Sequence, residues 1–245
     1  MLTQPVGVPV RHALPEAANA LLTGSGLGAT HLLDSLGVLV ENQGGLCSWL
    51  RSLLDDPARV REIAARSYWH TNGFAKLVLH TASAFRIRLH VWPAGDGRRG
   101  ETNPHSHRWD FASAVLAGDG LVIIEYEECD DGALYARHRY GRDAPNRAVL
   151  TPAGQVRLRP VSERTVPTLG RYATEISTVH TVDPLGSSLV ATLVVQGPLR
   201  ADSTVVYCAP ATEAEQVEHI LEAFDVRLLV GELLAVIDST VACCA

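Results

Sequence analysis

The chain has 245 residues, of which 47% are hydrophobic, and a net charge of −6 from 21 basic and 27 acidic side chains. This is an ordinary globular composition. Nucleic acids and anionic membranes are bound through clusters of positive charge, and the sequence has none, so we do not expect either as a partner. No apolar run reaches the length of a membrane span, and the five cysteines lack CxxC spacing, so we predict a cytoplasmic protein without disulfides.

The first 75 residues show apolar side chains at helical spacing, separated by breaks that contain glycine. Asp56 followed by Pro57 is a typical helix start, with a capping side chain and a proline suited to the first turn. We expect this segment to be a helical extension that packs on the rest of the chain. The predicted helices are 14–22, 28–40, 45–54 and 56–69.

From Lys76 to about Pro210 the pattern changes to short runs rich in Val, Ile, Leu, Thr and Tyr, divided by glycine-containing turns. This number and spacing of strands is typical of a closed antiparallel barrel or a double-sheet roll, which deals with exposed sheet edges. We assign residues 76–210 to this β-barrel. The predicted strands are 76–81, 84–92, 104–116, 120–128, 133–140, 155–166, 171–180, 188–196 and 203–207.

After Pro210 the spacing becomes helical again, and Thr212 with Glu215 fits a capping box. We expect residues 211–245 to form a C-terminal helix and tail. The predicted fold class is therefore mainly β, with α-helices at both ends of the chain.

Two histidines, His105 and His107, stand two residues apart in a predicted strand. Alternate residues of a strand point to one face, so both imidazoles could reach the same ion. A third histidine, His180, ends a later strand, and three imidazoles would leave other coordination positions open, as a catalytic site requires. The alternative is that the pair simply shares a solvated strand face, since the chain contains ten histidines.

These residues resemble the two motifs of the cupin superfamily, and the similarity covers residues 85 to 197. The resemblance implies a jelly-roll barrel with a metal inside it. The cupin glutamate position corresponds to Phe111 or Ala112 here, and the nearest carboxylate, Asp110, is one residue out of phase with His107. The matching positions are Gly100, His105, His107 and Gly118 in the first motif, and Pro167, Gly170 and His180 in the second.

Within the cupins, the pattern is most similar to the thiol dioxygenase branch, typified by cysteine dioxygenase. That branch binds ferrous iron through three histidines without a carboxylate, so the resemblance implies Fe(II) at His105, His107 and His180. The residues that recognise the substrate are altered: Tyr68 matches the family's tyrosine, but His70 stands where its carboxylate-binding arginine would be. The family's Ser-His-Tyr relay corresponds to Thr192, Val194 and Gln196.

The strand that starts at Phe85 alternates, with Arg86, Arg88, His90 and Trp92 on one face. If this face lines the barrel, Arg88 and His90 are the best pocket candidates, and an arginine there suits an anionic substrate. The alternatives are a solvated face, or a structural ion pair with a glutamate such as Glu125 or Glu127.

The remaining site candidates follow from strand parity and from the resemblance. Trp109 and Phe111 share the parity of His107 and could form an apolar wall that excludes water. Tyr172 shares the parity of His180 and could act as an acid, together with His90. We also expect Tyr68, His70 and Gln196 to contact substrate. Whether Asp110 or His90 joins the metal ligands is left open.

The sequence therefore predicts a mononuclear Fe(II) oxygenase that acts with O₂ on a small polar metabolite such as a thiol, an amino acid or a carboxylate. The first alternative is an isomerase, lyase or cyclase that uses Zn, Ni or Mn as a Lewis acid, because imidazoles suit several divalent ions. The second is a metal-containing protein that only binds a small molecule. A homodimer formed through a sheet is a further expectation from the resemblance.

Overall fold

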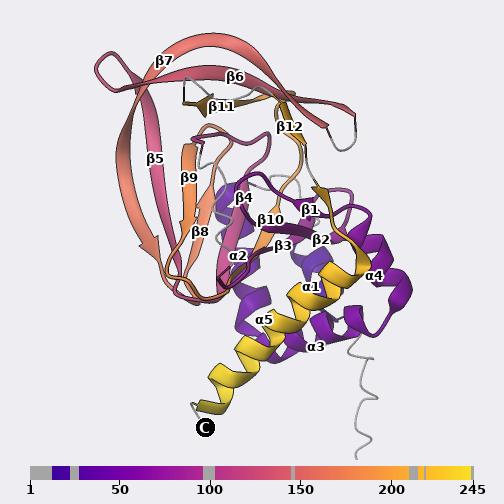
Figure 1. Ribbon diagram of the computed structural model, residues 1–245. Coiled ribbons are helices and arrows are strands. Elements are labelled where there is room, and N and C mark those ends of the chain that lie inside the picture. Colours follow the sequence, from indigo (N-terminus) through magenta and orange to yellow (C-terminus); the bar gives the residue numbers. More distant parts are fainter. Residues whose placement is uncertain are drawn as a thin grey trace, which may run out of the picture.

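The computed structural model describes residues 13–22, 28–95, 103–144, 147–209, 215–217 and 219–243 (Figure 1). Gly100 and Thr212 lie outside these residues. The helices are α1 (Ala13–Leu22), α2 (Ala29–Glu41), α3 (Gln43–Leu54), α4 (Pro57–Ala64) and α5 (Ala223–Cys243). The strands are β1 (Tyr68–Trp69), β2 (Ala75–Thr81), β3 (Arg86–Trp92), β4 (Phe111–Ala117), β5 (Leu121–Cys129), β6 (Ala133–Ala144), β7 (Arg147–Val166), β8 (Arg171–Thr174), β9 (Val179–Pro184), β10 (Val190–Gln196), β11 (Thr204–Cys208), β12 (Glu215–Val217) and β13 (His219–Ile220).

The strands form two antiparallel sheets, with the orders β13-β1-β2-β3-β10-β4-β8 and β11-β6-β7-β5-β9. The chain crosses between the sheets repeatedly, because β4, β8 and β10 lie in the first while β5, β7 and β9 lie in the second. This alternation defines a double-sheet jelly roll, the architecture of cupins. The predicted fold class, mainly β with helices at both ends, is confirmed.

Two hydrophobic cores occupy the two faces of the first sheet. On one face Ile87, Leu89 and Val91 of β3 pack with side chains from all five helices. On the other face Trp92, Phe111 and Val194 pack with Leu121 and Ile123 of the second sheet, in the interior of the roll. Strand β3 therefore alternates as predicted, although both of its faces are buried. Figure 1 shows the helices gathered outside the first sheet, with the β6–β7 hairpin arching over the opposite side.

Several predicted elements end at other residues than the sequence indicated. The predicted helix 56–69 stops at Ala64, and Tyr68 and Trp69 instead pair with β2 and β13. The predicted strand 171–180 is divided into β8 and β9, which belong to different sheets. The C-terminal helix begins at Ala223 rather than near 212, because residues 215–217 and 219–220 pair as strands with β7 and β1.

Gly118, the second glycine of the first cupin-like motif, lies in the turn between β4 and β5, and the backbone there requires a glycine. Gly118 has a φ of 94°, and a Cβ at this position would collide with the carbonyl oxygen of Leu189. Only glycine adopts this conformation at little cost, so the turn between β4 and β5 depends on it. This turn sets where β5 begins, and β5 pairs with the strand that carries His180.

Candidate metal centre

The segment that precedes β4 carries His105 and His107, and it is not a regular strand as predicted. Residues 104–110 form only isolated bridges, in which His105 pairs with His180 on one side and with Val206 on the other. The His105 and His180 backbones exchange two hydrogen bonds, of 3.1 and 3.0 Å. This narrow pairing inserts His105 between β9 and β11 and fixes its ring beside that of His180.

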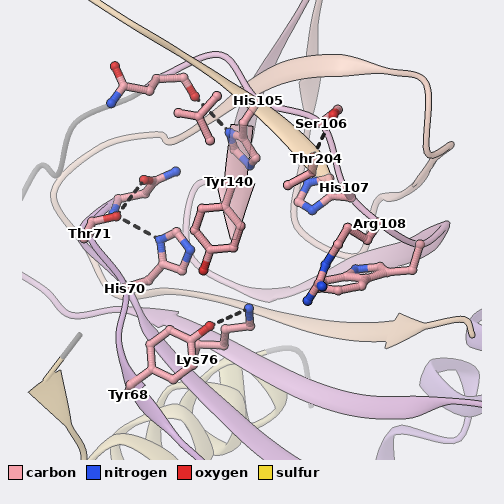
Figure 2. Close-up of a pocket in the computed structure, with 14 residues that line it drawn as sticks. Tyr68, His70, Thr71, Lys76, His105, Ser106, His107, Arg108, Tyr140 and Thr204 are labelled. Atoms are coloured by element: carbon pink, nitrogen blue, oxygen red, sulfur yellow. Dashed lines mark hydrogen bonds between the residues drawn. The ribbon is translucent and has the colours of Figure 1, made fainter. Parts of the chain in front are cut away.

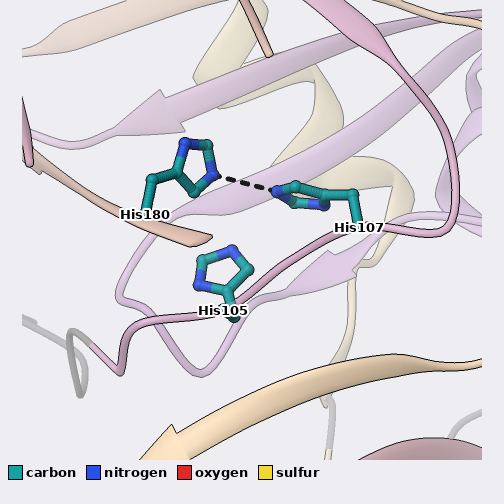
Figure 3. Close-up of side chains that lie close together, drawn as sticks. All are labelled: His105, His107 and His180. Atoms are coloured by element: carbon teal, nitrogen blue, oxygen red, sulfur yellow. Dashed lines mark hydrogen bonds between the residues drawn. The ribbon is translucent and has the colours of Figure 1, made fainter. Parts of the chain in front are cut away.

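The three imidazoles converge on one point (Figure 3). Their ring centroids lie 4.9, 5.2 and 5.1 Å apart, and one potential ligand atom from each lies within 4.8 Å of the others. The Nε2 atoms of His107 and His180 are 3.0 Å apart. Two nitrogens bound at about 2.1 Å to one ion are separated by roughly 3.0–3.4 Å for bond angles of 90–109°, so this spacing fits a shared metal.

The protonation state of the three rings also fits metal binding. Desolvation by burial lowers the pKa of His105, and it lowers the pKa values of His107 and His180 well below the ordinary value. The rings are therefore neutral at pH 7, the form in which imidazole binds a metal. His105 Nδ1 lies 2.8 Å from the Asn103 carbonyl oxygen; donation to this carbonyl leaves Nε2 for an ion and orients the ring.

No carboxylate joins the group among the described residues. Asp110 is 1% exposed, but one of its oxygens accepts a hydrogen bond of 2.8 Å from the Ile176 N–H and the other pairs with Arg200. The glutamate position of the resemblance corresponds to Phe111 or Ala112, and neither side chain can bind a metal. The candidate ligands in the described part of the chain are thus the three histidines alone. Neither Asp110 nor His90 belongs to this group.

Two cavities meet at the histidines. The outer cavity, of about 110 Å³, is shown in Figure 2 and extends toward Tyr68, Tyr140 and Thr204. The inner cavity, of about 70 Å³, extends into the roll toward His90, Trp92 and Tyr172. His105 and His107 line both cavities, so a metal held there would be reached from two sides.

Trp109 and Phe111, the residues of the predicted apolar wall, lie beside the histidines. The Trp109 and Phe111 rings lie 6.2 and 4.9 Å from that of His107. Phe111 also contacts His180 and Tyr172, at centroid distances of 5.9 and 6.0 Å. These aromatic rings form an apolar contact surface on one side of the histidine cluster.

Arg88 and Tyr172, both predicted pocket residues, lie in the inner cavity. Arg88 is 5% exposed, and its guanidinium stands 5.0 Å from the centre of the Trp109 ring. Two of the glutamates considered as its partners form ion pairs with other arginines: Glu125 with Arg164 and Glu127 with Arg159. Burial raises the pKa of Tyr172 to about 12, so its hydroxyl stays protonated at neutral pH and can donate.

Tyr68 and His70 lie at the outer cavity, where the sequence placed substrate contacts. The Lys76 ammonium donates a hydrogen bond of 2.9 Å to the Tyr68 hydroxyl, and the His70 ring stacks on Phe74 at 4.7 Å. Figure 2 shows Lys76, Tyr68 and His70 together below His105.

Gln196 does not line either of these cavities, although it is buried on the interior face of β10. Its register partners are Arg86 and Phe111, at the end of β10 beyond Val194, which does reach the inner cavity. The contact between Gln196 and substrate stays a prediction.

Sequence reasoning missed Lys76 and Phe74. Lys76 lines both cavities, and its positive charge adds to desolvation in lowering the pKa values of His90, His105 and His107. The one signal that could have indicated Lys76 is a charged residue at the start of the predicted strand 76–81, which continues with the apolar residues 77–79. Phe74 contacts His70, His90 and Trp92, but it lies in the turn before β2, where parity gives no guidance.

No protein-family model and no curated protein matches the sequence. Similar solved structures include a cupin domain from Bordetella pertussis, at 14% identity over 51% of this chain and 93% of that chain, with a TM-score of 0.29. An RmlC-like cupin from Methanocaldococcus jannaschii is 11% identical over 53% and 84% of the two chains, with a TM-score of 0.30. A hydroquinone 1,2-dioxygenase from Sphingomonas sp. TTNP3, with 4-hydroxybenzoate bound, is 12% identical over 58% and 74%, with a TM-score of 0.31.

Among the described helices, none combines the length and apolar character that crossing a membrane would need.

Proposed function

We propose that this protein is a mononuclear metal enzyme, an Fe(II) oxygenase that acts on a small polar metabolite inside a jelly roll. The observation that carries the proposal is the convergence of three neutral imidazoles, two of them with Nε2 atoms 3.0 Å apart, at the meeting point of two cavities. Three ligands on one side of an ion leave positions open for substrate and O₂. A structural site would use every position.

The absence of a carboxylate from the candidate ligand set, among the described residues, supports a site of the thiol dioxygenase type. Asp110, three residues after His107, is engaged by Ile176 and Arg200. When bound, Fe(II) would supply Lewis acidity and a redox-active centre for dioxygen.

The chain's own groups would bind and orient the substrate. Arg88 and Lys76 give the cavities a positive potential that favours an anionic or multiply oxygenated molecule. Trp109 and Phe111 restrict water, and the Tyr172 hydroxyl can donate a proton or a hydrogen bond within the inner cavity.

The test begins with protein purified without oxygen. Elemental analysis gives the metal, and an oxygen electrode measures consumption with a panel of thiols, amino acids and small carboxylates. Iron near one equivalent with substrate-dependent oxygen consumption supports the proposal. Zinc, nickel or manganese with turnover but no oxygen consumption would replace it with a Lewis-acid isomerase, lyase or cyclase, and a protein without metal or turnover would contradict both.

A further inference from the structure

The interior wall of the roll carries buried polar atoms that have no hydrogen-bond partner. Among the described residues they include His90 Nε2 and Trp92 Nε1 on β3 and the Thr192 hydroxyl on β10, the neighbouring strand of the same sheet. Trp92 is 7% exposed and Thr192 1%. Native proteins leave few buried polar groups unpaired, and each such group calls for an explanation.

These atoms lie close together. His90 and Trp92 are two residues apart on β3 and so point to the same side, with ring centroids 6.4 Å apart. Thr192 is the register partner of His90 on β10. The Phe74 ring contacts both, with ring centroids 4.6 Å from His90 and 4.9 Å from Trp92. His90 and Trp92 line the inner cavity together with His105, His107 and His180, whereas Thr192 does not line it.

The chemistry of the orphan atoms selects the group they would bind. An indole N–H only donates, so Trp92 requires an acceptor. The His90 imidazole can also donate from Nε2, and a carboxylate oxygen accepts from both. A buried donor or acceptor without a hydrogen-bond partner destabilises the folded protein, because the group has lost its hydration. A ligand that accepts these hydrogen bonds would remove this penalty.

The surrounding charge favours an anion. Lys76 is the register partner of His90 on β2, and Arg88 precedes His90 by two residues on β3. Both line the inner cavity, and no Asp or Glu occurs among the described residues that line it. Charged acceptors also form the stronger hydrogen bonds.

We propose that His90 and Trp92 are specificity-determining residues that hydrogen-bond the carboxylate of a small substrate at the inner end of the cavity. The opposite end of that substrate would face His105, His107 and His180. The inference deepens the proposed function, since it names a substrate class for the same site. A cavity of about 70 Å³ restricts the substrate to a few heavy atoms beyond the carboxylate.

The indole N–H signals give a direct test that does not depend on turnover. The chain has four tryptophans, so an ¹⁵N-labelled sample shows a small set of indole signals, and Trp92→Phe identifies that of Trp92. The full chain, both as purified and after metal removal, is titrated with sodium propionate and with the uncharged propionamide. We expect propionate to shift the Trp92 signal saturably, propionamide to bind at least about tenfold more weakly, and the signal of Trp49, buried in α3, to stay in place.

Variants separate recognition from folding. His90→Phe and Trp92→Phe should each weaken propionate binding about tenfold, as expected for losing one hydrogen bond to a charged group, without changing metal content. The matched control is His80→Phe on β2, outside both cavities, which should leave the affinity unchanged.

The inference would be overturned by a Trp92 signal that neither probe moves, or by propionate affinity that survives in both variants. Equal binding of propionamide would reject the carboxylate as the recognised group. The titration of the metal-free chain needs no bound ion. It therefore tests carboxylate binding even if the protein proves to hold no metal.

Discussion

His107 and His180 are 73 residues apart in the chain, yet their Nε2 atoms lie 3.0 Å from each other. Without a bound ion this contact is a single hydrogen bond between two neutral rings, one donating and one accepting. With an ion, both nitrogens would become ligands. The pair links the segment before β4 to β9, and so joins the two parts of the sequence that carry the cupin-like motifs.

Replacing His180 tests the third ligand. We predict that His180→Ala weakens metal binding by at least about 100-fold, more than the 10–100-fold loss typical of an outer-sphere partner, because one of three protein ligands is removed. His80→Ala is the matched control, since His80 lies on β2 outside both cavities. Metal content is measured after dialysis against a chelator; full occupancy in the His180 variant would remove this residue from the site.

Asp110→Asn separates a structural carboxylate from a ligand. Asp110 connects the segment before β4 to Ile176 and Arg200, so its loss should lower the free energy of unfolding by about 1–3 kcal/mol while metal content stays the same. Arg200→Gln should cost less, because the Arg200 side chain is 50% exposed. Urea denaturation and elemental analysis measure the two effects, and loss of metal in the Asp110 variant would show that a carboxylate is required after all.

Arg88→Met tests whether the buried guanidinium serves the substrate. Methionine keeps much of the volume but removes the charge, so we expect KM for the substrate to rise roughly 10–100-fold, as for a lost charged hydrogen bond, with little change in metal content. Arg86→Met is the control, since Arg86 is exposed on the same strand. Unchanged kinetics in the Arg88 variant would assign Arg88 to packing against Trp109.

The buried histidines predict how stability depends on pH in the metal-free protein. Burial lowers the pKa of His105, and lowers the pKa values of His90, His107 and His180 well below the ordinary value. Below about pH 6.5, where free histidine titrates, the unfolded chain binds protons that the folded chain does not. Stability is therefore complete above this pH and falls as the pH falls, by up to about 1.4 kcal/mol per pH unit for each such histidine.

Urea denaturation at pH 7.5 and 5.5 measures this dependence, in a range where carboxylates remain largely ionised. His90→Phe should reduce the difference between the two pH values, because it removes one of the titrating groups. An equal free energy of unfolding at both pH values would contradict the neutral, buried state of these rings.

The sequence was sufficient for the fold class and for the three histidines. Strand texture, glycine-containing turns and the spacing of His105, His107 and His180 all point to one barrel with one cluster. The expected strand geometry around His105 was wrong, since residues 104–110 are irregular, but the bridge to His180 brings the rings together by another route. Parity along β3 grouped Arg88 and His90 on one face, and the structure shows that this face lines the inner cavity.

Other features depend on contacts that one sequence does not display. The division of residues 171–180 between two sheets depends on pairing with β4 on one side and β5 on the other. Helical spacing near residue 215 was overridden by pairing with β7. Lys76 and Phe74 join the site only because β2 lies beside β3 and the preceding turn folds over His90.

The central claim is that three imidazoles hold a single metal ion inside the jelly roll. An anomalous-difference map from crystals of protein purified with its metal tests it most directly. We predict one peak per chain, at about 2.0–2.2 Å from a ring nitrogen of His105, His107 and His180, with an absorption edge that identifies iron. A peak bound by other residues, or no peak between these three rings, would contradict the account.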